Sequence, residues 1–139
     1  MSEKTLDQER SRLKKDAFSR HNGYELETLE RDRVVYRLDI SANSLNPYGM
    51  VHGGSLYTMA DDAAGVAIHT DGRHYVTQTG TLHFLSNRSE GVIRAEGRVR
   101  RRGKQTAFAS VEITDEQGVL LAAGDFVYFC IDPEYSQHT

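Results

Sequence analysis

One stretch of this chain has the apolar spacing of a long helix, and it constrains the fold more than any other feature. Between residues 54 and 70, apolar side chains recur at α-helical spacing, and Asp71-Gly72 follows as a helix stop. Many of the apolar positions are alanine or glycine, small residues that permit close approach of two backbones. We therefore expect one long helix that packs tightly against a curved sheet.

Alternation of apolar and polar residues predicts strands on both sides of this helix. It covers residues 31–40 before the helix and four stretches after it, at about 76–84, 93–100, 107–113 and 119–131. The connections at 89–91, 102–104 and 115–118 are short enough for antiparallel hairpins. In the first strand after the helix, we expect Val76, Leu82 and Phe84 to share one face.

The order of these elements predicts an α+β fold, in which an antiparallel sheet of about five strands faces one long helix. Residues 6–18 are charged with sparse apolar positions and predict a short surface helix, and residues 21–30 are expected to be a connector. No linker or repeat divides the 139 residues, so we expect a single domain spanning 1–139. Since only 38% of the residues are hydrophobic, the core must be economical or completed by a partner chain.

Charge and composition argue against several kinds of partner and location. The net charge of −3 argues against nucleic acid, and no apolar run approaches the roughly 20 residues of a membrane span. The polar start of the chain lacks the apolar core of a signal peptide, and the single cysteine, Cys130, cannot form an internal disulfide. We therefore expect a cytoplasmic protein. The histidines are not at zinc-type spacing, so no metal site is expected.

The loop before the long helix carries the residues with the clearest chemistry. It reads Asn46-Pro47-Tyr48-Gly49-Met50-Val51-His52-Gly53-Gly54, and the helix that follows contains Asp61. Free amides at a helix N-terminus can hold an oxyanion, and a carboxylate can attack a carbonyl or activate a water that does. This combination indicates acyl transfer. The same residues also fit simpler roles: the glycines can form a tight turn, His52 can orient the loop, and Asn46 can cap the loop or orient a water.

Two adjacent acids, Asp61 and Asp62, compete for the role of catalytic carboxylate. On a helical wheel of about 100° per residue, Asp61 lies on one flank of the apolar stripe beside Tyr57 and Ile68. Asp62 lies on the other flank, which is more polar. We therefore expect Asp61 to be partly desolvated, which suits a base or nucleophile, and Asp62 to be a solvated surface acid.

These residues resemble a known family. Asn46-Pro47-Tyr48-Gly49 followed by His52-Gly53-Gly54-Ser55-Leu56-Tyr57-Thr58-Met59-Ala60-Asp61-Asp62-Ala63 closely resembles the motif of the hotdog-fold acyl-CoA thioesterases, in the phenylacetate-pathway branch. The similarity covers most of the chain, including the strand near Thr77, Leu82-His83-Phe84-Leu85 and the turn Arg102-Gly103-Lys104-Gln105-Thr106. It implies a hotdog fold, in which the sheet wraps around the central helix, and hydrolysis of an acyl-CoA to free acid and coenzyme A. The chain departs from the family at Asn87, where a proline is usual, and this can alter the loop entering the next strand.

The resemblance also implies a role for each residue of the motif. Asp61 is the nucleophile or the general base at the thioester carbonyl, a choice that stays open within the family. The Gly53 amide polarises the thioester oxygen, and His52 and Asn46 help to position the thioester and the attacking water. Thr77 supports the carboxylate from a neighbouring strand, usually across a subunit interface.

The resemblance further implies a homodimer whose two sheets join into one, with active sites at the interface, and often a dimer of dimers. No separate cofactor is implied, because coenzyme A is part of the substrate. Its phosphates are negatively charged, and Arg100, Arg102 and Lys104 are candidates to bind them. The same three residues can equally form a solvated strand face at a hairpin.

Three functions are considered from the sequence. Acyl-CoA hydrolysis is the leading hypothesis, and a non-catalytic acyl-CoA-binding or sensor module on the same fold is the second. The third is a hotdog hydratase or dehydratase acting on acyl thioesters, although such enzymes typically pair a catalytic histidine with an acid in another arrangement. The acyl group can be aromatic, of phenylacetyl or hydroxybenzoyl type, or short- to medium-chain aliphatic.

Overall fold

The computed structural model describes residues 3–132. Two helices, α1 (Glu3–Leu13) and α2 (Ala17–His21), precede the strands β1 (Tyr24–Glu30) and β2 (Arg33–Asp39). A short 3-10 helix (Ala42–Ser44) and the long helix α3 (Gly53–His69) follow. The strands after α3 are β3 (Tyr75–Phe84), β4 (Val92–Arg102), β5 (Thr106–Asp115) and β6 (Leu120–Cys130). None of the helices in this described part is long and apolar enough to cross a membrane.

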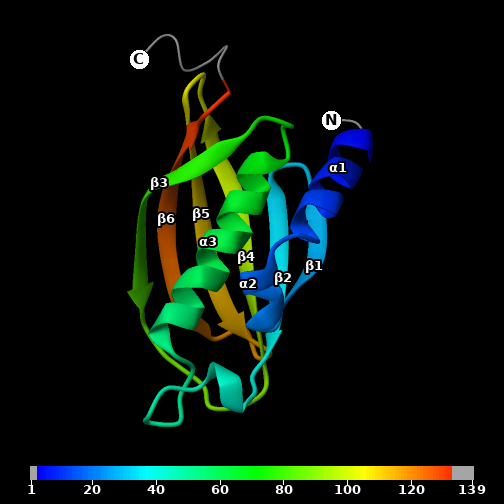
Figure 1. Ribbon diagram of the computed structural model, residues 1–139. Coiled ribbons are helices and arrows are strands. Elements are labelled where there is room, and N and C mark those ends of the chain that lie inside the picture. The colour runs from blue at the N-terminus through cyan, green and yellow to red at the C-terminus, as the bar shows by residue number, and fades with distance from the viewer. Residues whose placement is uncertain (1–2, 133–139) are drawn as a thin grey trace.

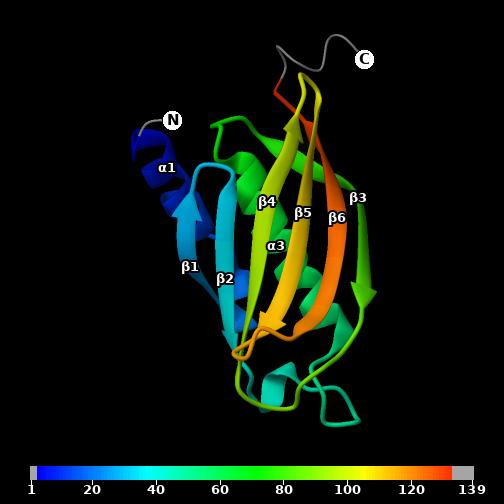
Figure 2. The ribbon, with the colours of Figure 1, turned by 180° about the vertical axis from the view of Figure 1, so that it is seen from behind.

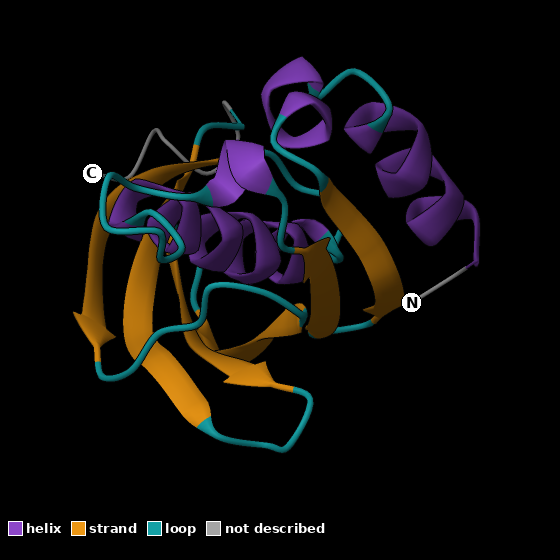
Figure 3. Cartoon of the chain, turned by 90° about the horizontal axis from the view of Figure 1, so that it is seen from below, coloured by secondary structure: helices purple, strands orange, loops and turns teal. Residues whose placement is uncertain are grey.

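The six strands form one antiparallel sheet in the order β1-β2-β4-β5-β6-β3. Helix α3 lies along one face of the sheet in Figure 1, and Figure 2 shows the strands covering the helix from behind. Figure 3, seen from below, shows the sheet curving around α3, with α1 and α2 on the side that the sheet leaves open. This arrangement is the hotdog fold, so the predicted architecture is confirmed.

The small residues of α3 let the sheet and the helix pack closely. Ala63, Ala64 and Ala67 are fully buried, and β4 passes over them at Gly97. A side chain at position 97 would place its Cβ in collision with the Ala63 backbone carbonyl. The close backbone approach expected from the composition of the helix is therefore confirmed.

The N-terminal part of the structure differs from the prediction in two ways. Residues 6–18 predict one helix, but Asp16 begins a second helix by accepting a hydrogen bond from the Ser19 N–H over 3.1 Å. The segment expected to be a connector contains β1, whose alternation is interrupted by a bulge between Leu26 and Thr28. An irregular edge strand of this kind has no clean period-two pattern, and the sheet therefore has six strands rather than about five.

Strand β3 lies at an edge of the sheet beside β6, not beside β4. The prediction of a hairpin at residues 89–91 is therefore wrong, since residues 85–91 cross the end of the sheet to reach β4 (Figure 1). A loop's length alone does not distinguish a hairpin from such a crossover. The turns at 102–104 and 115–118 do join antiparallel neighbours, as predicted.

A bulge in β3 determines which of its side chains face α3. The pairing of β3 with β6 shifts by one residue after Thr77, which lies opposite Tyr128. As a result Thr77, before the bulge, and Leu82, after it, share the face toward the helix. Val76 points away from the helix and is 48% exposed, so its expected grouping with Leu82 and Phe84 is wrong.

Candidate active site

Asp61 lies near the middle of α3, and hydroxyl groups from two strands hold its carboxylate. The Thr77 hydroxyl of β3 donates to Oδ1 over 3.0 Å, and the Tyr128 hydroxyl of β6 donates to the same oxygen over 2.7 Å. The structure therefore brings Thr77 to Asp61, but within one chain rather than across a subunit interface. The bulge in β3 is the reason, because it turns Thr77 toward the helix.

Sequence reasoning did not identify Tyr128. In β6, Phe126, Tyr128 and Cys130 alternate toward the interior and are buried. A buried tyrosine hydroxyl usually has a hydrogen-bond partner, and this requirement is the signal that could have pointed to it. Burial, together with the neighbouring charge of Asp61, raises the pKa of Tyr128, so the hydroxyl stays protonated and able to donate.

The start of α3 leaves one backbone amide free. The Gly54 N–H donates to Nδ1 of His52 over 2.9 Å, and the N–H groups of Ser55 and Leu56 both donate to the His52 carbonyl. Only the Gly53 N–H, of these first four amides, has no acceptor among residues 3–132. His52 is thus the N-cap residue that orients the loop, and Gly53 presents an amide that can bind an oxyanion.

Two asparagines hold the loop that precedes α3. Oδ1 of Asn46 accepts hydrogen bonds from the N–H groups of Tyr48 and Met50 at 2.9 and 3.2 Å, so Asn46 caps the loop, which is one of the roles considered for it. At the departure from the family pattern, Nδ2 of Asn87 donates to the Val51 carbonyl over 2.9 Å. Asn87 therefore fastens the segment after β3 to the loop that leads into α3.

The free amide and the carboxylate lie far apart within one chain. Gly53 and Asp61 are eight residues apart on α3. A rise of about 1.5 Å per residue separates them by roughly 12 Å along the helix axis. One thioester carbonyl cannot contact both groups in a single chain, so a site that uses both needs a second copy of α3.

Asp62 lies in a different environment from the one predicted. Helix α2 covers its flank of α3, and Ser19 hydrogen-bonds Oδ2 of Asp62. Burial raises the pKa of Asp62 to about 7, a shift that the hydrogen bond from Ser19 opposes and the charges of Asp16 and Asp61 increase. The prediction of a solvated surface acid is wrong, because the helical wheel does not show that the N-terminal helices cover this side of α3.

Comparison with known proteins identifies the family. The family model of the thioesterase superfamily matches residues 48–122, a range that begins in the loop before α3 and includes α3, β3, β4 and β5. The chain belongs to the thioesterase superfamily. The family expected from the loop and helix motif is therefore confirmed.

Several known proteins resemble the chain over most of its length. The acyl-coenzyme A thioesterase PaaI of Escherichia coli (strain K12) is 29% identical over 118 residues, which cover 84% of each chain. The structure of the E. coli PaaI protein matches with a TM-score of 0.89 and 26% identity over 94% of this chain and 96% of that chain. A 1,4-dihydroxy-2-naphthoyl-CoA hydrolase of Listeria monocytogenes is 27% identical, with 71% of this chain and 83% of that protein covered. A hypothetical thioesterase of Streptococcus pneumoniae TIGR4, solved with coenzyme A, has a TM-score of 0.75 and 28% identity over 78% of this chain and 89% of that chain.

In this member of the thioesterase superfamily, the basic side chains at the turn between β4 and β5 lie in two different environments. The largely buried guanidinium of Arg102 donates to Asp32 over 2.6 Å and to a carbonyl in the last turn of α3 over 2.8 Å, and it lies 2.9 Å from Asp71. These contacts correct the expectation for Arg102, because internal partners already occupy its donors. Arg100 and Lys104 are exposed and are left as the candidates to contact phosphates.

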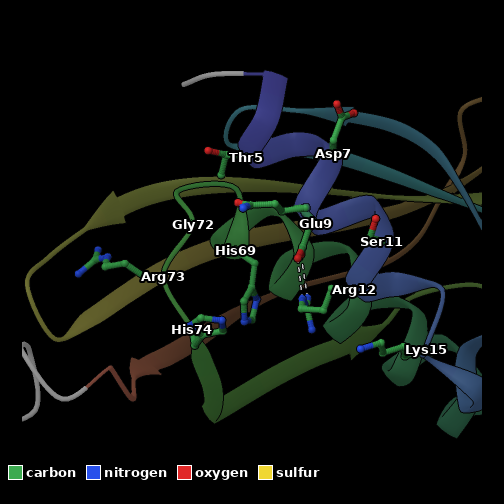
Figure 4. Close-up of a pocket in the computed structure, with 11 residues that line it drawn as sticks. Thr5, Asp7, Glu9, Ser11, Arg12, Lys15, His69, Gly72, Arg73 and His74 are labelled. Carbon is green, nitrogen blue, oxygen red and sulfur yellow. Dashed lines mark hydrogen bonds and ion pairs between the residues drawn. The ribbon is translucent and has the colours of Figure 1, made fainter.

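Cavities lie next to the N-terminal helices of this thioesterase-superfamily chain. A cavity of about 150 Å³ adjoins Asp61 and is lined also by Thr77 and Tyr128. A larger one, of about 930 Å³, lies between α1 and the connection from α3 to β3, beside the Glu9–Arg12 ion pair, and Asp61 does not line it (Figure 4). Of these, the cavity of about 150 Å³ contains the Asp61 carboxylate. No group of three His, Cys, Asp or Glu within residues 3–132 is placed to hold a metal ion.

Proposed function

We propose that this protein is an acyl-CoA thioesterase, which hydrolyses the thioester of an acyl-CoA to the free acid and coenzyme A. The observation that carries the proposal is the carboxylate of Asp61, held by two hydroxyls on a helix whose first amide, at Gly53, has no internal acceptor. Membership of the thioesterase superfamily supports the same reaction, as do the thioester hydrolases among the relatives.

In the proposed reaction, the Gly53 amide donates a hydrogen bond to the thioester oxygen and stabilises the negative charge that develops there. Asp61 either attacks the carbonyl carbon or takes a proton from a water that attacks it. In both cases the coenzyme A sulfur leaves with the electron pair of the C–S bond and takes up a proton. If Asp61 is the nucleophile, water then hydrolyses the mixed anhydride between Asp61 and the acyl group, which releases the free acid and restores the carboxylate. His52 and Asn46 contribute by holding the loop that presents the amide.

The proposed enzyme is a homodimer in which two chains share each site. Because Gly53 and Asp61 are roughly 12 Å apart on one helix, two antiparallel copies of α3 would bring Gly53 of one chain beside Asp61 of the other. Strand β3 is at an edge of the sheet and exposes Val76, which favours pairing of this edge with a second copy. Such pairing would join two sheets into one, and two of these dimers can associate further.

Coenzyme A is the proposed carrier of the acyl group, without any other cofactor, and the cytoplasm is the proposed location. The exposed Arg100 and Lys104 can bind its phosphates. Among the relatives, PaaI comes from a phenylacetic acid degradation operon and the Listeria enzyme is a naphthoyl-CoA hydrolase. These names favour an aromatic acyl group over a short- or medium-chain aliphatic one as the first substrate class to test.

The test is to follow release of free thiol from phenylacetyl-, hydroxybenzoyl-, butanoyl- and octanoyl-CoA by the wild type and by Asp61→Asn. Hydrolysis by the wild type and its loss in Asp61→Asn are expected. Asp62→Asn is the matched control, since it removes the neighbouring charge on the same helix and should keep most of the turnover. Wild-type turnover by Asp61→Asn would refute the assignment, and tight acyl-CoA binding without thiol release by the wild type would favour a binding module instead.

A further inference from the structure

The two oxygens of the Asp61 carboxylate have different surroundings. Oδ1 accepts hydrogen bonds from both Thr77 and Tyr128, at 3.0 and 2.7 Å. Among residues 3–132 no donor contacts Oδ2. The carboxylate is therefore anchored through one oxygen and open at the other.

The Tyr128 hydroxyl also fixes this carboxylate relative to the helix backbone. Besides the bond to Oδ1, it lies 3.0 Å from the main-chain carbonyl oxygen of Asp61 itself. A single hydroxyl that bridges the carbonyl and the carboxylate of the same residue restricts the side-chain torsions between them. Thr77 hydrogen-bonds Oδ1 but not the Asp61 carbonyl, so it does not impose this restriction.

From these contacts we infer that Tyr128 is a positioning residue for the proposed reaction, one that holds Oδ1 of Asp61 so that Oδ2 faces the thioester carbonyl or the attacking water. The inference rests on the proposed thioesterase function. If Asp61 is the nucleophile, Oδ2 forms the bond to the carbonyl carbon as the C–S bond breaks and the thiolate leaves. If Asp61 is the base, Oδ2 receives the proton of the attacking water.

The surroundings of Tyr128 place its hydroxyl beside Asp61. The side chain is 2% exposed, and its ring stacks beside Phe126 at 6.5 Å between centroids. On α3, position 65 lies one turn beyond Asp61 and is a glycine, and a Cβ there would be 3.4 Å from the Tyr128 hydroxyl. The helix thus carries no side chain at position 65, beside the hydroxyl, and the ring packs in the interior of the fold.

Other ionisable groups face the same cavity and can contribute to a pH profile. They come from α1 (Arg12), the residue before α2 (Asp16), α3 (Asp62 and His69) and β3 (Tyr75). A substitution of Tyr128 leaves all of them in place. A change in the profile that is specific to that substitution therefore reports on the bond to Asp61.

The experiment compares Tyr128→Phe with the wild type in thiol release from the best acyl-CoA of the panel, across pH. Removing a donor to an ionised carboxylate makes proton uptake easier, so the acidic limb of the kcat/KM profile should move up by about one pH unit. We also expect kcat to fall on the order of tenfold, with KM little changed, because the carboxylate is less well oriented. Tyr24→Phe is the matched control, since Tyr24 is also buried and its hydroxyl lies 3.0 Å from a carbonyl of α3, at Ser55.

Two further variants separate the outcomes. Site-specific 3-fluorotyrosine at position 128 keeps the ring and strengthens the donor, so it should move the acidic limb in the opposite direction, and it serves if Tyr128→Phe does not fold. If Asp61→Asn is inactive while both position-128 variants have the wild-type profile and turnover, the inference about Tyr128 is wrong and the proposed function stands. If Asp61→Asn keeps wild-type turnover, the proposed function itself fails.

Discussion

The free amide of Gly53 can be removed without disturbing the helix, by changing Gly53 to proline. Gly53 is the first residue of α3, a position where proline is favoured because its fixed φ suits a helix and its missing N–H has no helical partner. The preceding residue, His52, has φ −61° and ψ 132°, an extended conformation that a following proline requires. Gly53→Pro should therefore fold with wild-type stability while lacking one hydrogen-bond donor.

The size of the expected effect follows from the other amides at the start of α3. The N–H groups of Gly54, Ser55 and Leu56 are already used by His52, so none of them can replace the lost donor. Removing one donor from an oxyanion hole typically lowers kcat by about 10² to 10³, or roughly 3–4 kcal/mol in the activation free energy. We expect a loss of this size in Gly53→Pro, mostly in kcat, since the charge develops in the transition state.

The control is Gly53→Ala, which keeps the N–H. Its Cβ would lie 3.7 Å from the Phe84 ring, an ordinary contact, so turnover should stay within a few-fold of the wild type. Thiol release gives kcat and KM, and thermal unfolding shows that both variants fold. If folded Gly53→Pro turns over as fast as Gly53→Ala, the amide is not the oxyanion donor and the reasoning is refuted.

The same variant tests whether two chains share a site. A purified heterodimer of one Gly53→Pro chain and one Asp61→Asn chain contains one intact pair of groups if each site takes its amide from one chain and its carboxylate from the other. Such a heterodimer should recover about half of the wild-type activity, although each homodimer is nearly inactive. A heterodimer as inactive as the two homodimers would exclude a shared site.

Three further predictions concern residues around the site. Arg102→Ala should lower the free energy of unfolding by about 2–4 kcal/mol, because it breaks largely buried charge-assisted hydrogen bonds, whereas Arg100→Ala should leave the melting temperature unchanged and raise KM for acyl-CoA. An unaltered melting temperature of Arg102→Ala would contradict its structural role. Gly97→Ala should lower the free energy of unfolding, measured with urea, by about 1–3 kcal/mol, because its Cβ would meet backbone that cannot rotate away. An unshifted urea midpoint would contradict this. The pKa of Asp62 in the folded state is about 7, above its ordinary 3.8, so protonation of Asp62 favours the folded state. This contribution to the free energy of unfolding is complete below pH 3.8 and is lost as the pH rises toward 7. Over that pH range the free energy of unfolding of the wild type should fall by at most about 4 kcal/mol relative to Asp62→Asn, with no further fall above it. Unfolding at a series of pH values measures this. A difference in stability between the two proteins that does not change with pH would show that Asp62 is not buried in solution.

The regular elements of the fold are predictable from the sequence, because their patterns are local. The helix around Asp61 and the last three strands each have a clear period, and the turns between those strands are short. The order of the strands in the sheet is harder to predict from the sequence. Placing β3 beside β6 depends on long-range pairing, and β1 is hidden because its bulge breaks the alternation after Leu26. The short N-terminal helix is predicted from the sequence, but its division into α1 and α2 and the side of α3 that they cover are not, because these depend on long-range packing.

Some residues of the candidate site can likewise be predicted from the sequence, and others cannot. Gly53, His52 and Asp61 stand in one continuous segment, so their motif can be read from the chain. Tyr128 is 67 residues away from Asp61 and reaches it only because β6 and β3 lie side by side over α3. Arg102 shows the reverse case, because the sequence around an arginine in a basic turn does not reveal whether its donors face solvent or, as here, carboxylates of the same chain.

The contrast between Asp61 and Asp62 shows how the N-terminal helices give two adjacent acids different surroundings. Ser19 hydrogen-bonds Oδ2 of Asp62, whereas Asp61 is held by Thr77 and Tyr128 through Oδ1. With a pKa of about 7, Asp62 is roughly half protonated at neutral pH, and its negative charge beside Asp61 is correspondingly reduced. Helix α2 therefore covers only one of two adjacent acids, and the two acids differ in their surroundings because different elements cover them.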